Sequence, residues 1–295
     1  MASRLAAACC LAIGVGSTTA LAAAAAQTQS DTSVETTLAA MRSYLAQYRQ
    51  DLTFVIADEL ASQRVRRSPR ESNTPEARTT TSTVHFRFVE DDNSWMAIRE
   101  VQTVDGQPAE RGDSLAVALR DQQTGVVARN FKTYNSRFNI GKIVRTFNEP
   151  TLPLNILDPD RVSRFKFKRE RSKVEDGVTL VTLSFREEPS ARPFIYDLRM
   201  QQAQVRGEFL VEAGTGRIRK TTLNVKMGRV RATLTTTYAL DGKLDLWVPL
   251  TFTERYQNGI ELTGVMTGVP VSYEQVYCES TYSNFQRFSA TARIK

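Results

Sequence analysis

Alternation of apolar and polar side chains through residues 205–288 is the feature that most constrains this fold. A period of two over such lengths is typical of β-strands with one buried face. Between Val230 and Tyr238 the alternation is strict, and arginine and threonine fill the opposite face. The neighbouring segments present two further apolar sets, first Thr221, Leu223, Val225 and Met227, then Leu246, Val248, Leu250 and Phe252.

Turn dipeptides divide the apolar runs into hairpins. Asp176-Gly177, Asp241-Gly242 and Asn258-Gly259 have the composition of primed hairpin turns, which need positive φ angles. Strands are expected at 81–89, 94–104, 163–171, 178–187, 260–264 and 276 to about 288. The segment 53–65 allows either a continued helix or a strand, and we favour the strand. The predicted fold is α+β: a large curved antiparallel sheet, an incomplete β-barrel of about 10–11 strands.

Two helical regions complete this prediction. Val34, Leu38, Met41, Leu45 and Tyr48 form one stripe of an amphipathic helix over 33–50. Such a stripe can face a partner or a membrane, but packing on the protein's own sheet is favoured. Residues 66–80 have the composition of a loop.

A helical insertion is expected at about 113–158. Asp113 or Ser114 can cap its first helix, a second can follow Gly125, and 152–157 can add one or two turns. The insertion can cover an open end of the sheet or form a lid.

The N-terminus has the features of a secretory signal peptide. A short positive region with Arg4 precedes an apolar core, and small residues lead to a cleavage site after Ala26, with Ala22 as the alternative. A membrane anchor is less favoured because the apolar core is short and interrupted by glycines. The mature chain, 27–295, is then a single β-rich domain in the periplasm or outside the cell, without a transmembrane segment. Its only cysteine, Cys278, is expected to be a buried small hydrophobe.

The sequence gives little support to several classes of enzyme and metal site. His85 is the only histidine, so metal sites with several histidines are excluded and a nucleophile triad would have to use it. No phosphate loop, dinucleotide-binding or zinc-protease motif occurs, and we predict no metal, no cofactor and no nucleic-acid partner. Carboxylate pairs remain available for acid–base catalysis, namely Asp58/Glu59, Glu110/Asp113 and Glu254/Glu279.

Basic residues gather around one predicted hairpin. Arg217, Arg219, Arg229 and Arg231, with Lys220 and Lys226, can form a strip that grips phosphate or carboxylate groups such as lipid headgroups. A solvated outer face explains the same residues and is favoured.

The apolar face of the sheet offers the better candidate site. A curved sheet with helices across its mouth either fills its concavity with side chains or leaves a ligand cavity, and the sequence leaves both open. The candidate cavity lining consists of Leu223, Val225, Leu234, Tyr238, Leu250 and Phe252.

Several stretches resemble a family of uncharacterised secreted bacterial proteins. They are WMAIREVQTVDGQP (95–108), residues 137–154, GEFLVEAGTGRIRK (207–220), LWVPLTFTERY (246–256) and TYSNFQRF (281–288). This resemblance implies no catalytic residues. The order of signal peptide, amphipathic helix and many strands also resembles the lipoprotein-carrier (LolA-like) superfamily. That resemblance implies an incomplete barrel that shelters acyl chains, although the insertion here is longer than that group leads us to expect.

The favoured hypothesis is therefore a non-enzymatic exported protein that binds an apolar or amphipathic ligand, such as a lipid or a lipoprotein acyl chain, in a half-barrel. The second is a structural or interaction module of the cell envelope, with a filled core and an envelope component as partner. The third is a carboxylate-dependent hydrolase.

Overall fold

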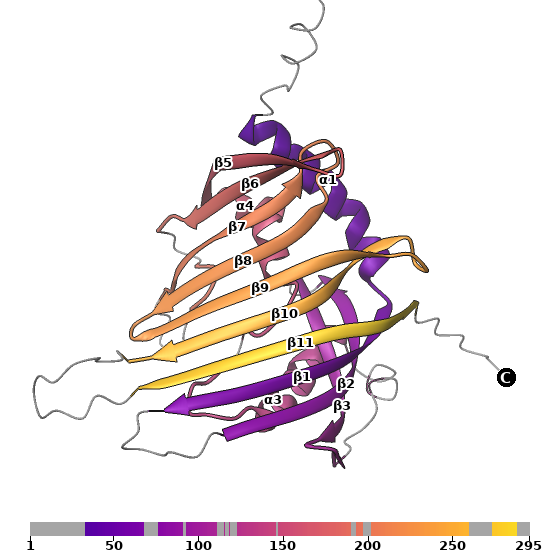
Figure 1. The fold of residues 1–295 in the computed structure, drawn as a ribbon, viewed down its shortest axis with the longest axis vertical. Helices are drawn as coiled ribbons and strands as arrows, with labels where there is room; N and C mark the ends of the chain where they lie inside the picture. The colour runs from indigo at the N-terminus through magenta and orange to yellow at the C-terminus, as the bar shows by residue number, and fades with distance from the viewer. Residues whose placement is uncertain are drawn as a thin grey trace, which may run out of the picture. The chain divides into compact units, whose positions relative to one another are not determined.

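Eleven antiparallel strands form one open sheet in the computed structural model (Figure 1). The structure describes residues 33–67, 76–90, 93–110, 115, 118, 123–145, 147–189, 193–196, 202–259 and 273–287. The strand order is β4-β3-β2-β1-β11-β10-β9-β8-β7-β6-β5. The strands are β1 (Val55–Arg67), β2 (Glu76–Val89), β3 (Ser94–Val104), β4 (Gln107–Pro108), β5 (Phe165–Glu175), β6 (Val178–Glu187), β7 (Gln204–Glu212), β8 (Ile218–Met227), β9 (Val230–Asp241), β10 (Leu246–Asn258) and β11 (Glu274–Arg287).

The predicted two-faced strands are confirmed. Burial alternates along β8 and β9, where Leu223 and Leu234 are cross-strand partners on the buried face. β1 is a strand, as favoured, and it joins the two halves of the sheet by pairing with both β2 and β11. The loop prediction for 66–80 is wrong at both ends, because β1 continues to Arg67 and β2 begins at Glu76.

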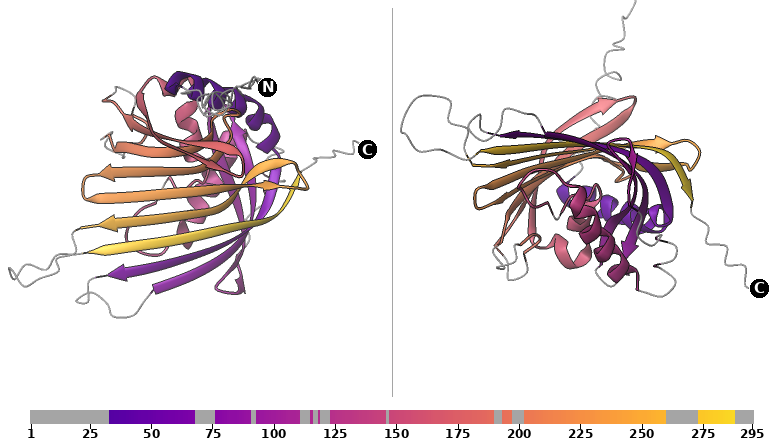
Figure 2. Two further views of the ribbon diagram at one scale, coloured as in Figure 1. Left: turned by 45° about the horizontal axis from the view of Figure 1, so that its top comes forward. Right: turned by 90° about the horizontal axis from the view of Figure 1, so that it is seen from below.

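The helices all lie on one side of the sheet (Figure 2). α1 (Val34–Leu52) begins at Ser33, whose side chain accepts a hydrogen bond from the Thr36 backbone N–H and so caps the helix. Its buried residues are Thr37, Met41, Leu45, Tyr48 and Leu52, and they join the main core. The favoured interpretation of the stripe, packing on the protein's own sheet, is confirmed.

The insertion crosses the sheet, for a reason of topology. β4 and β5 flank it in sequence but lie at opposite edges of the sheet. The ten strand spacings between those edges would measure roughly 48 Å in a flat sheet. The chain covers this distance with α3 (Thr124–Asn135), η2 (Ser136–Phe138), η3 (Leu152–Leu157) and α4 (Pro159–Val162). It therefore fills the concave side rather than capping one end.

Side chains and backbone hydrogen bonds tie the insertion to the sheet. The Pro150 carbonyl oxygen accepts hydrogen bonds from the hydroxyls of Thr236 (2.7 Å) and Tyr238 (3.3 Å) on β9. On β3, which β4 covers for only two residues, the Trp95 backbone N–H donates to Asn155 Oδ1 (2.9 Å) and that of Ala97 to Glu149 Oε2 (2.9 Å). These acceptors satisfy the donors of an otherwise open strand edge.

The turn predictions have mixed outcomes. Asp176 and Gly177 both have positive φ, 51° and 75°, as a primed turn requires. Asp241-Gly242 is not such a turn. Asp241 Oδ1 accepts from the backbone N–H groups of Lys243 and Leu244, which lengthens the loop and moves the positive φ to Asp245 (49°).

Some predictions lie outside the described residues. These are the signal peptide with its cleavage after Ala26, the helix caps Asp113 and Ser114, the strand 260–264 and the end of the last strand at 288. The division into signal peptide and mature domain therefore stays a prediction. Among the described helices, none combines the length and the apolar character needed to cross a membrane.

Candidate functional site

Five of the six predicted cavity-lining residues are part of the packed core. Each of the five is at most 7% exposed, and they are Leu223, Val225, Leu234, Tyr238 and Phe252. Leu250 is 44% exposed, because the register of β10 against β9 shifts between Pro249 and Thr251. This bulge takes Leu250 out of the alternation that the sequence suggested. None of the six lines either of the two cavities described next.

The basic residues do not form one strip. Arg217 and Arg219 lie at the start of β8, where both approach Glu212, at 3.7 Å and 2.5 Å respectively. Arg229 and Arg231 lie at the far end, where Arg231 pairs in register with Lys226. Seven residues of strand, roughly 23 Å, separate Arg219 from Lys226.

Two of the three predicted carboxylate pairs lie wholly within the described residues, and neither is placed to act as an acid and a base together. Glu254 is buried and pairs in register with Cys278 on β11. Glu279 is the next residue of β11, so its side chain lies on the opposite face of the sheet, where it accepts a hydrogen bond from the Tyr277 hydroxyl. Asp58 is exposed and Glu59 is buried, as expected for neighbours on a strand. Of the remaining pair, Glu110 is exposed and Asp113 lies outside the described residues.

The larger cavity is a groove beside α1, with a volume of about 940 Å³. Its floor is apolar and comes from α1, the β2–β3 end of the sheet and η3. The floor residues are Leu45, Phe88, Trp95, Leu154 and Leu157. We call this cavity the α1 groove. At its rim, α1 contributes the exposed residues Arg42 and Ala46 and the half-buried Arg49.

Charged groups at the rim of the α1 groove are held in place. The Arg49 guanidinium lies 3.7 Å from the centroid of the Phe88 ring and 3.4 Å from Asp158 Oδ2. Asp158 also caps α4 by accepting from the Asp160 backbone N–H. The groove thus combines an apolar floor with two arginines, Arg42 and Arg49, and two carboxylates, Glu90 and Asp158, of which Asp158 is paired with Arg49.

Phe54 adds an exposed aromatic ring at the same groove. It is 55% exposed, and its φ of 78° lies in the left-handed region, which aromatic residues rarely adopt. The Arg87 guanidinium lies 4.6 Å from its ring centroid. Strained backbone of this kind is concentrated at ligand sites in proteins.

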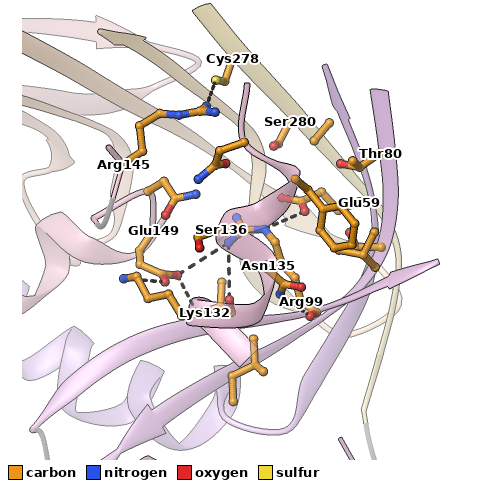
Figure 3. A pocket seen from close by; sticks show the side chains of 18 of the residues that line it. Glu59, Thr80, Arg99, Lys132, Asn135, Ser136, Arg145, Glu149, Cys278 and Ser280 are labelled. Carbon is orange, nitrogen blue, oxygen red and sulfur yellow. Dashed lines mark hydrogen bonds and ion pairs between the residues drawn. The ribbon is translucent and has the colours of Figure 1, made fainter. Parts of the chain in front are cut away.

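The smaller cavity, of about 80 Å³, lies between the sheet and the insertion (Figure 3). We call it the polar pocket. Strands β1, β2, β3, β10 and β11 contribute inward-facing polar side chains to it. The cover comes from α3 and from residues 138, 139, 145, 148 and 149. The charged lining residues are Glu59, Arg99, Lys132, Arg145, Glu149 and Glu254.

Ion pairs connect four of these groups. Arg99 Nε donates to Glu59 Oε2 at 2.8 Å, and Arg99 Nη1 lies 4.0 Å from Glu149 Oε2. Lys132 Nζ lies 3.2 Å from Glu149 Oε1. The side chain of Glu59 is only 1% exposed, so its charge depends on Arg99 for compensation.

Arg145 and Glu254 have neutral partners. Arg145 Nη1 donates to Cys278 Sγ at 2.6 Å, and Arg145 Nη2 donates to Gln63 Oε1 at 2.7 Å. Glu254 accepts from the Tyr256 hydroxyl, and burial raises its pKa above the ordinary range. Cys278 is 4% exposed, which confirms the expected buried side chain, and this burial raises the pKa of its thiol to about 12.

Replacing Glu254 by glutamine should make the difference in unfolding free energy between variant and wild type depend on pH. Since the folded-state pKa of Glu254 is raised, its protonated form stabilises the fold below the unfolded-state pKa, and this stabilisation is lost as the pH rises through the folded-state value. Glutamine is neutral throughout. In urea titrations from pH 4 to pH 8, the unfolding free energy of the variant should therefore increase relative to that of the wild type as the pH rises. A pH-independent difference would contradict the raised pKa.

His85 also has a partner. Its Nε2 lies 3.0 Å from Glu100 Oε2, and the residue is 6% exposed. Among the described residues, no group of three or more His, Cys, Asp or Glu side chains could hold a metal ion.

Comparisons with known proteins give likenesses of fold only. No protein-family model matches the sequence, and no curated protein matches it. A putative outer membrane lipoprotein-sorting protein domain from Vibrio parahaemolyticus is similar at 10% identity, covering 87% of this chain and 94% of that one, with a TM-score of 0.38. A DUF1329 family protein from Desulfovibrio piger is similar at 11% identity, covering 86% and 95%, with a TM-score of 0.36.

At such identities and TM-scores the likeness does not extend to a ligand, a partner or an activity.

Proposed function

We propose that this protein is exported, is not an enzyme, and binds an amphipathic, lipid-like ligand in the α1 groove. The observation that carries the proposal is the groove itself, with its apolar floor and a volume of about 940 Å³. Pockets for small ligands span about 300–1,000 Å³ and combine apolar walls with a few polar groups. Export rests on the signal-peptide features of residues 1–26.

The two ends of such a ligand have different partners in the groove. An acyl chain would lie against Phe88, Trp95 and Leu154, and an anionic headgroup would lie near the guanidinium groups of Arg42 and Arg49. This places the ligand beside α1 instead of in the apolar hollow of the half-barrel, where the predicted lining residues are packed.

Filling the groove should abolish this binding. Ala46→Trp adds a large side chain at the rim, whereas Gln47→Trp adds the same side chain at an exposed position of α1 that does not line the groove. Displacement of a fluorescent fatty acid should show an affinity at least about tenfold lower for the first variant only, since about 1.4 kcal/mol of lost contact corresponds to a factor of ten.

Both variants should unfold within about 0.5 kcal/mol of the wild type, because exposed substitutions cost little. Equal affinities for the two variants, or a wild type that binds no probe and carries no extractable lipid in native mass spectrometry, would contradict the proposal.

A structural or interaction module of the envelope is the second candidate, and the filled interior favours it. The insertion and α1 together cover the apolar face, so the core needs no ligand to be complete. Immobilised protein should then retain one specific protein or polymer from an envelope extract, while native mass spectrometry finds it free of lipid. Loss of all such retention would count against this candidate.

A further inference from the structure

Arg145 is a buried cation that forms no ion pair with the described residues, and its charge acts on the Glu254 carboxyl, whose pKa it lowers, without a hydrogen bond between the two. It is 4% exposed, and its hydrogen-bond acceptors are Cys278 Sγ, Gln63 Oε1 and, at 3.3 Å, the Ile140 carbonyl oxygen. All three are formally neutral. Its Nε atom has no hydrogen-bond partner. Burying a charge is costly unless an opposite charge and hydrogen bonds compensate for it.

The other charges of the polar pocket compensate for one another. Glu59 is paired with Arg99, and Glu149 is paired with Lys132 and accepts from the Ala97 backbone N–H. The remaining carboxyl, Glu254, accepts from the Tyr256 hydroxyl, and its raised pKa favours the neutral form. Of the three cations that line the pocket, Arg99 and Lys132 form ion pairs with carboxylates of the described residues, and Arg145 does not.

The space beside Arg145 is small and polar. The pocket volume of about 80 Å³ is less than a tenth of the 940 Å³ of the α1 groove, which suits a small anion better than an acyl chain. The hydroxyls of Thr80, Ser82 and Ser280 line it and can donate hydrogen bonds. Lys132 and Ser136 lie at its rim, where the Lys132 side chain is 33% exposed (Figure 3).

We propose that the polar pocket binds a small oxyanion, a carboxylate or a phosphate, against the Arg145 guanidinium. Such an anion supplies the missing counter-charge and accepts hydrogen bonds in the geometry that guanidinium groups favour. The ligand can be a free anion or the acidic end of a slender molecule that enters past Lys132. The site lies apart from the α1 groove, and the two lining sets share no residue.

Titration of the full chain with acetate and with phosphate at pH 7 tests this proposal. Potassium chloride holds the ionic strength constant, and calorimetry and the melting temperature report binding. We expect saturable binding and a rise in melting temperature with at least one oxyanion over chloride. Arg145→Met should weaken that binding about tenfold or more, the scale of a lost charge-assisted hydrogen bond. Arg229→Met, an arginine outside the pocket, should leave it unchanged.

Two further variants keep the test decisive should Arg145→Met fail to fold. Ala61→Leu fills the pocket without removing a charge and should abolish binding, whereas Glu254→Gln should retain it. Absence of saturable binding in the wild type would overturn the proposal. Binding that appears only in Glu254→Gln would also overturn it, because Glu254 would then be the counter-ion of Arg145. If succinate or glycerol phosphate binds more tightly than acetate or phosphate, the acidic end of a larger molecule is the ligand.

Discussion

Arg99→Met should lower the free energy of unfolding by about 3–5 kcal/mol, the cost of leaving a buried partner charge uncompensated. Arg99 Nε donates to Glu59 Oε2 at 2.8 Å, and Glu59 is among the most buried carboxylates of the described residues. Methionine fills much of the same volume, so loss of packing contributes little. Urea denaturation followed by circular dichroism measures the change, and an unchanged m-value would show that the folded state stays compact.

The double variant Glu59→Leu/Arg99→Met is the matched control. Both charges are then gone, and replacing a buried ion pair by apolar side chains is often neutral or stabilising. We therefore expect it to recover most of the stability that Arg99→Met loses. A double variant as unstable as the single one would mean that Arg99 acts through packing or through Tyr282, whose hydroxyl lies 3.5 Å from its Nη2, and not through Glu59.

Local patterns predicted the sheet but not the route of the chain across it. The alternation at Leu223 and Leu234 depends only on which face of a strand is buried, so it could be found from sequence. That β4 and β5 are opposite edges is a property of the whole strand order. No local pattern records it, and the insertion was therefore expected to cover an open end of the sheet or to form a lid, instead of crossing the concave side.

Single-residue irregularities also escaped prediction. Leu250 has the side chain and the parity of a core residue, and only the bulge between Pro249 and Thr251 exposes it. Asp241-Gly242 has the composition of a primed turn, but the Asp241 carboxylate captures two backbone N–H groups and extends the loop. The loop depends on side-chain hydrogen bonds that compete with the regular ladder, and the bulge begins at Pro249, which has no backbone N–H to donate to that ladder.

The sequence does indicate the polar pocket, through charged and polar residues at strand positions that belong to the buried face. Glu59 and Gln63 have the same parity in β1 as the buried residues Ala57 and Val65, and Glu254 has that of Phe252. Charged side chains at positions of the buried face are uncommon unless they are paired. In three strands a charged residue occupies a position where the alternation places a buried side chain. These residues, Glu59, Arg99 and Glu254, indicate a polar interior.

Gly216→Ala should be the most damaging glycine substitution that this fold allows at a turn. Gly216 has a φ of 72°, and a Cβ atom there would lie 2.3 Å from the carbonyl carbon and oxygen of Ala40 in α1. The clash is with backbone, so no side-chain rotation relieves it. We expect a loss of about 2–5 kcal/mol, which is the left-handed strain of about 1–2 kcal/mol together with an overpacking cost of about 1–3 kcal/mol.

Gly177→Ala is the control for backbone strain alone, since Gly177 has a φ of 75° and nothing within 4 Å of a Cβ atom. It should lose only about 1–2 kcal/mol in the same urea titration. The excess loss at Gly216 measures the contact between the β7–β8 turn and α1. Because α1 forms one wall of the α1 groove, Gly216→Ala should also weaken fatty-acid binding while Gly177→Ala leaves it intact. Equal losses of stability in the two variants would mean that α1 is free to shift away from the turn, and the groove would then lack the fixed wall that ligand binding requires.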